Sequence, residues 1–411
     1  MIQLDERRHR DLGDDAPVLA GIDTQKRAAF VQFGDFAAAA VRWLHNEPSQ
    51  YYAQDYSVDA VVQLARRGMA VMVIGLGAAE PKDVEVAGVR VVNRAGRLDS
   101  AGDVLEVAAL LRQWGASDVI MRTPSGELAA ACGGRTRVLP LLADSFARSW
   151  RGWWRRRALA RALAGPGRWV ANHQRGACAD LVRIGVPAGR VLPWDWPASH
   201  SPEQAAVRGA PADPAAPRLL YAGRLAAGKG LGDLIEAVAL LRKRGRRAEL
   251  TVAGGGDAGP FEAMAQRGGA AAAVHFLGVL PHERVVSLAC EHDIMVVPSR
   301  HAYPEGLPMT IYDALATRTP LVASDHPMFR QVLRDGETAV IFRAGRPAEL
   351  AGAVQRLCDD GDLGRRLSTH SLPAWRQLQQ VMKWRTLVYR WLRDAADDAA
   401  FFARHCLNPV P

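Results

Sequence analysis

The sequence predicts an α/β protein with two doubly wound domains, each a parallel sheet covered by helices on both faces. Short apolar or β-branched runs alternate along the chain with longer helical patterns, which is typical of parallel sheets with crossover helices. The alternation stops at residues 201–217, where four prolines occur, and then restarts. The 411 residues also exceed the usual size of one domain. We therefore expect a first domain over 1–200, a linker over 201–217 and a second domain over 218–370.

The first half contains strand-like runs separated by helical patterns. The expected strands are 28–33, 70–74, 89–93, 118–122, 138–143, 168–171 and 191–194. Among the helical patterns are 58–67, 104–114 and 175–184. The order of strands and helices predicts a Rossmann-like domain.

The second half repeats this rhythm. Its expected strands are 219–222, 249–253, 274–277, 294–298, 321–324 and 339–342, and its expected helices are 231–244, 284–291, 309–317 and 348–359. Apolar residues then recur every three or four positions, which predicts one long helix over about 373–404. We expect residues 371–411 to close the fold as this helix, packing back towards the first domain.

Composition and charge narrow the class of protein. Hydrophobic residues make up 49% of the chain and charged residues 23%, as in a globular protein. No apolar run reaches the roughly 20 residues of a membrane span, and the charged N-terminus does not resemble a secretory signal, so we expect a cytoplasmic protein. The five cysteines are scattered and form no CxxC pair, which predicts neither disulfides nor zinc. The net charge of +9 favours anionic partners, but no nucleic-acid-binding motif is present, and we expect no nucleic-acid partner.

A glycine-rich turn follows the first strand of the second half. Gly223 and Arg224 stand five residues before Gly228 and Lys229, at the point where a strand gives way to a helix. Backbone amides in such a turn can bind phosphate. The spacing approaches that of a P-loop, but Gly230 stands where that motif needs a Ser or Thr hydroxyl for magnesium. Two interpretations remain, a pair of solvated loop charges or a cationic phosphate site.

A second segment combines a buried strand, an acidic loop and a helix start. The run 294–298 ends in Pro298-Ser299, and Glu305 and Gly306 follow on the loop. Pro308 suits the start of a helix, which would place the amides of 307–309 at an anion-binding helix N-terminus. Taken alone, Glu305 could be a helix-capping carboxylate, and Asp313, further along, a surface residue.

Together these segments resemble the family-four retaining glycosyltransferases of the GT-B fold, also called group 1 glycosyl transferases. The family signature, a GR…KG turn followed by PS…EG(F/L) and a second acidic residue before Ala, stands here as Gly223-Arg224…Lys229-Gly230, Pro298-Ser299…Glu305-Gly306-Leu307 and Asp313-Ala314. The resemblance is close over about 218–360. The first 200 residues resemble the family in strand–helix order and in Gly185-Val-Pro187.

The resemblance implies a role for each matched residue. Arg224 and Lys229 would bind the donor diphosphate and stabilise the leaving group, Glu305 would contact the transferred sugar, and Asp313 would take the ribose hydroxyls. The remaining nucleotide-binding positions implied by the family are Gly223, Gly255, Gly256, Phe276, Leu277, Gly306, Leu307, Pro308 and Met309.

Two departures from the family pattern stand out. Asp313 is one methylene shorter than the family's second Glu. The family also often places a His after a strand of the first domain, facing the donor sugar, and here that strand ends in Asp144. Asp144 is the first candidate for this role and His173, after the next strand, the second; either could instead be structural.

The resemblance implies a retaining transferase that moves a hexose from a UDP- or GDP-sugar to a glycan or lipid-linked glycan acceptor. We expect no metal and no further cofactor, because Arg224 and Lys229 would meet the diphosphate charge, and Asp360-Gly-Asp362 lies in a polar turn. The alternative is a non-catalytic nucleotide-sugar sensor on the same scaffold. Residues 148–161, rich in Trp and Arg, are either a helix that contacts a membrane surface or an ordinary covering helix.

Overall fold

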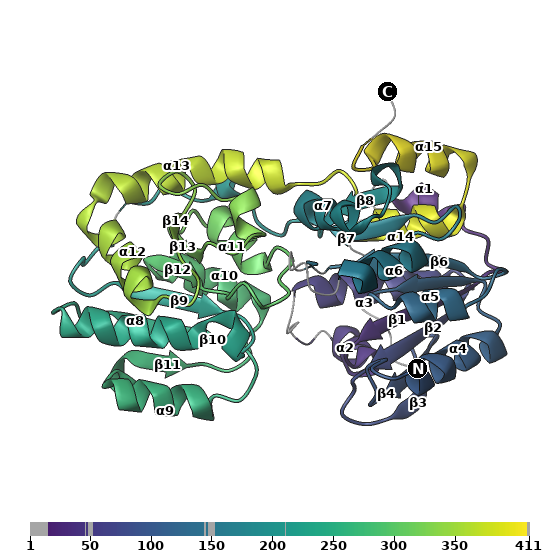
Figure 1. The fold of residues 1–411 in the computed structure, drawn as a ribbon, viewed down its shortest axis with the longest axis horizontal. Coiled ribbons are helices and arrows are strands. Elements are labelled where there is room, and N and C mark those ends of the chain that lie inside the picture. The colour runs from purple at the N-terminus through teal and green to yellow at the C-terminus, as the bar shows by residue number, and fades with distance from the viewer. Residues whose placement is uncertain are drawn as a thin grey trace. The chain divides into compact units, whose positions relative to one another are not determined.

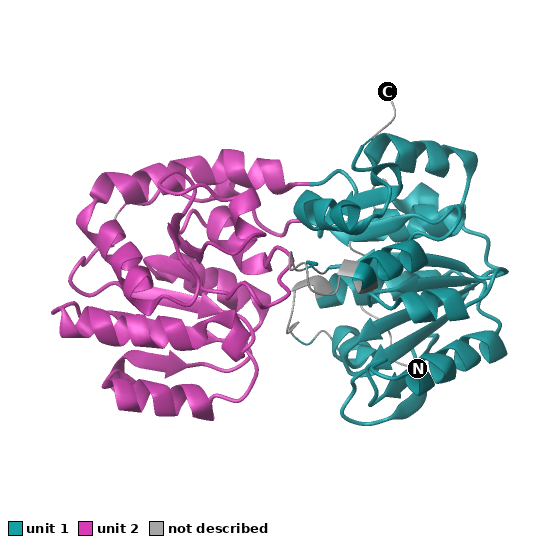
Figure 2. Cartoon of the chain, in the orientation of Figure 1, with its two compact units in different colours: residues 1–197, 380–411 teal, residues 198–379 magenta. Residues whose placement is uncertain are grey.

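The computed structural model describes residues 15–45, 47, 52–143, 145–146, 153–209 and 211–408. The chain forms two compact units (Figure 2). Unit 1 comprises Met1–Pro197 and Gln380–Pro411, and unit 2 is the continuous stretch Ala198–Gln379. Each unit is an α/β sandwich around its own sheet (Figure 1).

Within its described residues, unit 1 contains an eight-stranded sheet in the order β3-β4-β2-β1-β5-β6-β7-β8. The strands are β1 (Arg27–Phe33), β2 (Ala70–Leu76), β3 (Lys82–Val86), β4 (Val89–Arg94), β5 (Asp118–Met121), β6 (Arg137–Leu142), β7 (Val170–His173) and β8 (Val191–Trp194). Helices α1 (Asp15–Ala20), α2 (Phe36–Leu44), α3 (Tyr52–Arg66), α4 (Ala101–Trp114), α5 (Gly126–Ala131), α6 (Trp153–Leu163) and α7 (Gln174–Ile184) accompany them. All strand pairs are parallel except β3 with β4.

Strand β3 is absent from the sequence-based expectation. It forms a hairpin with β4 through Ala87 and Gly88, whose φ angles of 54° and 77° correspond to a tight hairpin turn. The charged run Lys-Asp-Val-Glu-Val is an exposed edge strand, and its charges protect that edge from further pairing. Its low apolar content explains why no strand is expected there.

Unit 2 contains, in its described residues, a six-stranded parallel sheet in the order β11-β10-β9-β12-β13-β14. The strands are β9 (Arg218–Ala222), β10 (Glu249–Ala253), β11 (Val274–Phe276), β12 (Ile294–Val297), β13 (Leu321–Ser324) and β14 (Val340–Phe342). The helices are α8 (Leu231–Lys243), α9 (Gly259–Gly268), α10 (His282–Glu291), α11 (Met309–Ala316), α12 (Pro347–Asp359) and α13 (Gly361–Leu378). These two sheets confirm the predicted fold class of two doubly wound α/β domains.

Residues 201–217, expected as a linker, are held on unit 2. The segment begins with a short helix, η3 (Pro202–Gln204), and continues to Arg208. The Arg208 guanidinium donates to the carbonyls of Ala289 at 2.9 Å and His292 at 2.6 Å, near the end of α10, and to Thr319 Oγ1 at 2.7 Å. One arginine therefore satisfies several buried acceptors of unit 2. The boundary between the units lies after Pro197, before the segment that was expected to be the linker.

The single long helix expected over 373–404 is wrong. Three helices occupy the region: α13, which already begins at Gly361, then α14 (Trp384–Arg393) and α15 (Ala396–His405). The chain leaves α13 to pair with Asp195, whose N–H donates to the Met382 carbonyl at 3.0 Å. Asp394 then adopts a left-handed conformation with φ of 59° and ends α14. The apolar periodicity continues across both breaks, so it does not reveal them.

Helix α14 is fixed to unit 1 by a buried ion cluster. Arg385 Nε donates to Asp15 Oδ2 at 2.9 Å and its NH1 to Asp59 Oδ2 at 3.5 Å. The three side chains are 8%, 10% and 3% exposed. A buried charge is tolerated only when it is paired, so these contacts stabilise the return of the chain to unit 1. Among the described residues, no helix is long and apolar enough to cross a membrane.

We predict that Arg385→Met removes the cation shared by the buried Asp15 and Asp59 carboxylates and destabilises unit 1 by about 3–5 kcal/mol. The measurement is the urea midpoint of the unit 1 transition, followed by tryptophan fluorescence. Arg90→Met removes an exposed pair with Asp83 in unit 1 and serves as the control, because exposed pairs contribute little. Equal midpoints for the two variants would contradict the role assigned to Arg385.

Candidate active site

The motifs of the second half meet at the carboxyl edge of the unit 2 sheet. Strand β9 lies between β10 and β12. The chain adds β10 and β11 on one side of β9, and then β12, β13 and β14 on the other. Such a reversal point is where open α/β sheets bind ligands. The loop from β9 to α8 carries Arg224 and Lys229, and the loop from β12 to α11 carries Glu305. These two loops leave neighbouring strands.

Glycines allow the loops to pack backbone against backbone. Gly223 and Gly254 have φ angles of 155° and 152°, and a Cβ on Gly254 would lie 1.8 Å from the Gly223 carbonyl oxygen. Gly256, with φ of 135°, would place a Cβ 2.7 Å from the Leu225 carbonyl oxygen. The Leu225 N–H donates to the Gly255 carbonyl at 2.8 Å. These glycines are therefore required for the fit between the β9–α8 and β10–α9 loops.

Gly230 explains why the turn departs from a P-loop. Its φ is 74°, and an added Cβ would lie 2.0 Å from the Pro298 carbonyl oxygen. A Ser or Thr cannot occupy this position without separating α8 from the end of β12. The steric constraint thus excludes the magnesium-binding hydroxyl of the P-loop motif at this turn.

Lys229 and Glu305 form a nearly buried ion pair. Lys229 Nζ donates to Glu305 Oε1 at 2.5 Å, and the side chains are 16% and 7% exposed. The buried Ser299 hydroxyl donates to the same oxygen at 2.6 Å. The ammonium also lies 4.9 Å from the centre of the Tyr303 ring. With two donors on Oε1, the carboxylate is oriented before any ligand arrives.

The Arg224 side chain lies outside this pair. The residue is exposed, and no side chain of the described residues bonds to its guanidinium. Its backbone is held by Tyr221, whose hydroxyl donates to the Arg224 carbonyl at 2.7 Å. Burial, together with the negative charge of Glu305, raises the pKa of Tyr221, so this hydroxyl remains a donor. Arg224 and Lys229, which the sequence analysis grouped together, therefore lie on the same loop without a contact between their side chains.

The loop that carries Glu305 is anchored by residues that sequence reasoning missed. Arg300 bonds Asp233 on α8 through both Nε, at 2.9 Å, and NH2, at 2.6 Å, and its N–H donates to the Gly228 carbonyl. His326 Nε2 lies 3.1 Å from the Tyr303 carbonyl. Burial lowers the pKa of His326, which favours a neutral ring with Nε2–H as the donor. These contacts cross between elements distant in sequence, so no local pattern indicates them.

Asp313 is buried and bonded to a histidine. It lies one turn into α11, which begins after Pro308, and its Oδ1 accepts from His282 Nε2 at 2.9 Å. His282 is the first residue of α10. Burial lowers the pKa of His282, but the hydrogen bond and charge of Asp313, aided by Glu283, outweigh that effect and raise it. The contact with His282 was not expected from sequence.

The other expected nucleotide-binding positions lie on the same edge of unit 2. Phe276 ends β11, and the Leu277 N–H donates to the Val252 carbonyl at 2.9 Å. Gly306 and Leu307 lie between Glu305 and Pro308, and Met309 opens α11. Their roles towards a nucleotide stay predictions.

Comparisons with known proteins identify this unit. Residues 205–371 match the family model described as Glycosyl transferases group 1. Unit 2 carries this match, and we refer to it as the group 1 domain. The chain is 36% identical over 158 residues to the alpha-D-kanosaminyltransferase of Streptomyces kanamyceticus, which covers 38% of this chain and 40% of that relative. It is 32% identical over 209 residues to the glycogen synthase of Mycobacterium tuberculosis, 50% of this chain and 45% of that protein. Each match thus spans less than half of the relative's length.

Solved structures extend the likeness to both units. A sucrose-phosphate synthase from Thermosynechococcus elongatus superposes with a TM-score of 0.63 at 17% identity, covering 89% of this chain and 99% of that one. WaaG, a glycosyltransferase of lipopolysaccharide biosynthesis, gives 0.62 at 14% identity, covering 90% and 100%. Anabaena HepE in complex with UDP-glucose gives 0.57 at 13% identity, covering 92% and 98%. The fold is therefore GT-B.

Asp144 and His173, the two candidates for a first-domain residue that faces the donor sugar, both lie outside the group 1 domain. Asp144 lies outside the described residues. His173 ends β7 in unit 1, is 3% exposed, and its Nε2 lies 3.2 Å from Asp195 Oδ1. Lys383 also bonds Asp195, at 3.4 Å. His173 therefore has a structural partner, and a role towards a donor sugar stays a prediction.

The Asp360-Gly-Asp362 turn next to α13 has a structural role in the group 1 domain. Asp360 is the N-cap of α13 and accepts from the Leu363 N–H at 2.9 Å. An N-cap carboxylate is a common helix-starting group.

We predict a pH-dependent contribution of His282 to the stability of the group 1 domain. A raised folded-state pKa gives stability that is fully present below the unfolded value, about 6.5, and is lost as pH rises through the folded value. The gap in melting temperature between wild type and His282→Gln should therefore be larger at pH 6 than at pH 8.5. A gap that widens towards high pH would show that the pair does not favour the protonated imidazole.

Proposed function

We propose that the protein is a retaining glycosyltransferase that moves a hexose from a UDP- or GDP-sugar to a glycan or lipid-linked glycan acceptor. The observation that carries this proposal is the Lys229–Glu305 pair at the carboxyl edge of β9 and β12. In this pair, Lys229 would supply a cation for a diphosphate, and Glu305 would supply an oriented carboxylate for a sugar hydroxyl. The group 1 match over residues 205–371 supports the same reaction class.

Lys229 would stabilise the leaving group. An ammonium has three N–H donors, so the bond to Glu305 leaves others for the diphosphate. Arg224, exposed on the same loop, would add a second cation, and the amides at the start of α11 would add donors. Negative charge grows on the diphosphate as its bond to the sugar breaks, and fixed donors are most effective against such developing charge.

The transfer itself would take place on one face of the sugar. The acceptor hydroxyl oxygen forms a bond to the anomeric carbon as the bond from that carbon to the diphosphate breaks. The hydroxyl proton passes to a diphosphate oxygen, so no protein base is required. Glu305 would accept a hydrogen bond from a hydroxyl of the transferred sugar and fix its orientation.

The relatives support a nucleotide-sugar donor. HepE has been crystallised with UDP and with UDP-glucose. WaaG takes part in lipopolysaccharide biosynthesis and AmsK of Erwinia amylovora in amylovoran biosynthesis, which supports a glycan or lipid-linked glycan as the acceptor here. No observation favours the alternative of a non-catalytic sensor.

We predict that Lys229→Ala lowers kcat by roughly 100-fold or more with a much smaller rise in the donor KM, as for removal of an oxyanion donor. The assay is transfer from, or slow hydrolysis of, the matched UDP- or GDP-sugar. Lys243→Ala, at the exposed end of α8, is the matched control and should keep the wild-type rate. A change confined to KM would mean that Lys229 only binds the donor.

The same assay examines the proposed independence from metal. The wild-type rate should be unchanged in EDTA, because Lys229 and Arg224 would supply the positive charge. Loss of activity that magnesium or manganese restores would overturn this part of the proposal. Absence of turnover with every donor, despite nucleotide binding, would favour the sensor.

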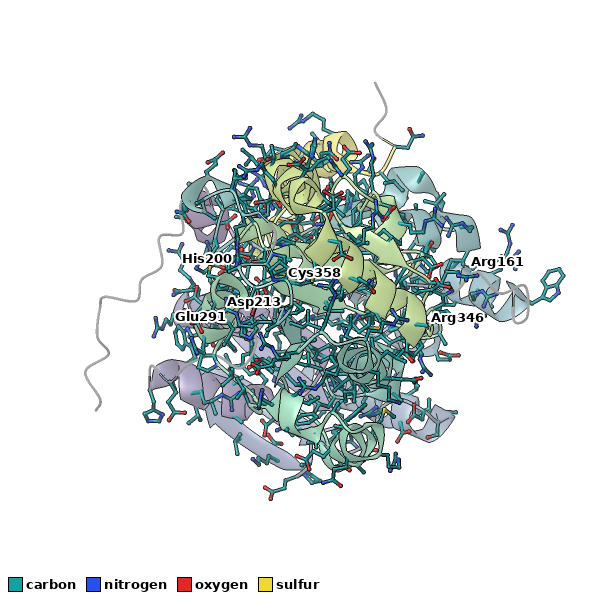
Figure 3. The ribbon with its side chains drawn as sticks, turned by 90° about the vertical axis from the view of Figure 1, so that its left-hand side faces the viewer. Arg161, His200, Asp213, Glu291, Arg346 and Cys358 are labelled. Carbon is teal, nitrogen blue, oxygen red and sulfur yellow. The ribbon has the colours of Figure 1, made fainter. Side chains whose placement is uncertain are left out.

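We also propose that helix α6 contacts an anionic membrane surface. Trp154 is 76% exposed, and Arg161 (Figure 3) is exposed on the same helix. Exposed tryptophan beside arginine is typical of interfacial helices. Trp154→Ala should reduce co-sedimentation with phosphatidylglycerol vesicles, and salt should release the wild type. Equally weak sedimentation with phosphatidylglycerol and phosphatidylcholine vesicles at low salt would instead indicate a covering helix.

A further inference from the structure

His282 and Asp313 come from different elements but form one buried pair. His282 opens α10, which follows β11, and Asp313 lies in the first turns of α11, which follows β12. Their side chains are 9% and 10% exposed and are joined by the 2.9 Å bond from Nε2 to Oδ1. The His200 ring (Figure 3) lies edge-on to His282, 6.2 Å between centroids. Both helix starts lie on the carboxyl edge that also carries Lys229 and Glu305.

The geometry couples the identity of residue 313 to that of residue 282. An additional methylene would advance the carboxylate of residue 313 by about 1.5 Å. With Oδ1 already 2.9 Å from Nε2, a glutamate in the same rotamer would run into the imidazole. The histidine thus occupies the room that a longer acidic side chain needs. The shortened acid and the histidine are two parts of one arrangement.

The loop that leads to His282 carries exposed apolar side chains. Leu277 is 44% exposed and Val279 is 49% exposed, although both are large and hydrophobic. Gly255, on the β10–α9 loop, approaches Val279 so closely that a Cβ would lie 3.0 Å from Val279 Cγ2. Exposed apolar side chains on the loop that precedes the pair suit a ligand with a flat base joined to a hydroxylated sugar.

We propose that His282 is a positioning residue for nucleoside recognition: it orients the short Asp313 carboxylate so that this carboxylate accepts the ribose hydroxyls of the donor. The proposal rests on the proposed function, in which Asp313 binds the ribose, and adds the residue that makes an aspartate sufficient there. His282 acts through Asp313, and Leu277 and Val279 provide the surface for the base.

The test measures affinity for the diphosphates of uridine and guanosine and for their 2′-deoxy counterparts by calorimetry. The ratio of deoxy to ribo dissociation constants reports contact with the ribose, and a merely structural role does not change it. His282→Ala should weaken the ribonucleotide by about 10-fold or more, as for loss of a charge-assisted hydrogen bond, and bring the ratio close to one. His282→Gln, which retains an N–H donor, should preserve the ratio.

Because residues 282 and 313 are coupled, a second substitution should restore the binding that the first one weakens. Asp313→Glu alone should weaken binding because of the clash with the imidazole. The double variant, His282→Ala with Asp313→Glu, supplies both the longer acid and the room for it, and should bind the ribonucleotide more tightly than either single variant. His275→Ala, which removes an exposed histidine on β11, is the matched control and should leave the affinity unchanged. Circular dichroism and melting temperature verify that each variant is folded.

The outcomes separate this inference from the proposed function. An unchanged deoxy-to-ribo ratio in folded His282→Ala, or a double variant no better than the single ones, overturns the inference while leaving the transferase proposal intact. If the ratio collapses but no donor is turned over, the positioning role stands and the transferase proposal falls. Failure of wild type to bind either ribonucleotide contradicts both.

Discussion

The edge of unit 2 that carries the candidate active site depends on close backbone contacts that leave no room for a side chain. A Cβ on Gly230 would lie 2.0 Å from the Pro298 carbonyl oxygen. Lys229 directly precedes Gly230 and Ser299 directly follows Pro298, so this single contact determines how closely the two donors approach Glu305. Gly254 plays the corresponding part for the neighbouring loop, against Gly223. The chemistry proposed for the site thus depends on these glycines, because only a residue without a side chain permits such close contacts.

The carboxylates of Glu305 and Asp233 at this edge are each held by more than one hydrogen-bond donor. Glu305, which is nearly buried, accepts from both Lys229 and Ser299. Around it, Asp233 holds Arg300 and thereby the loop on which Glu305 lies. Buried ionic groups cost free energy unless they are fully paired, so an arrangement in which each anion has several donors keeps the site rigid without a ligand. Rigid placement of donors is what catalysis by electrostatic stabilisation requires.

Sequence patterns predicted the fold and the motif-bearing residues for physical reasons. Buried parallel strands leave continuous apolar runs, and glycines at strand ends mark the turns, so β9, β12 and Lys229 could be placed without coordinates. Contacts between residues far apart in sequence have no such local signal. Arg208 looks like part of a linker until its acceptors on unit 2 are known, and His282 looks like a surface histidine until Asp313 is placed beside it. The breaks around α14 were missed because apolar periodicity continues through them.

Unit 1 is discontinuous in the chain, and this has a consequence for the order of folding during synthesis. Trp384 is fully buried and stacks on Phe30 and Trp196, so the core of unit 1 contains a side chain from near the C-terminus. Unit 2 is one uninterrupted stretch, Ala198–Gln379, and is complete before Trp384 leaves the ribosome. Domains generally fold as units as they emerge, the N-terminal one first. Here the order is inverted: the unit synthesised second is the first that can finish its core, and the first half of unit 1 waits for the segment that begins at Gln380.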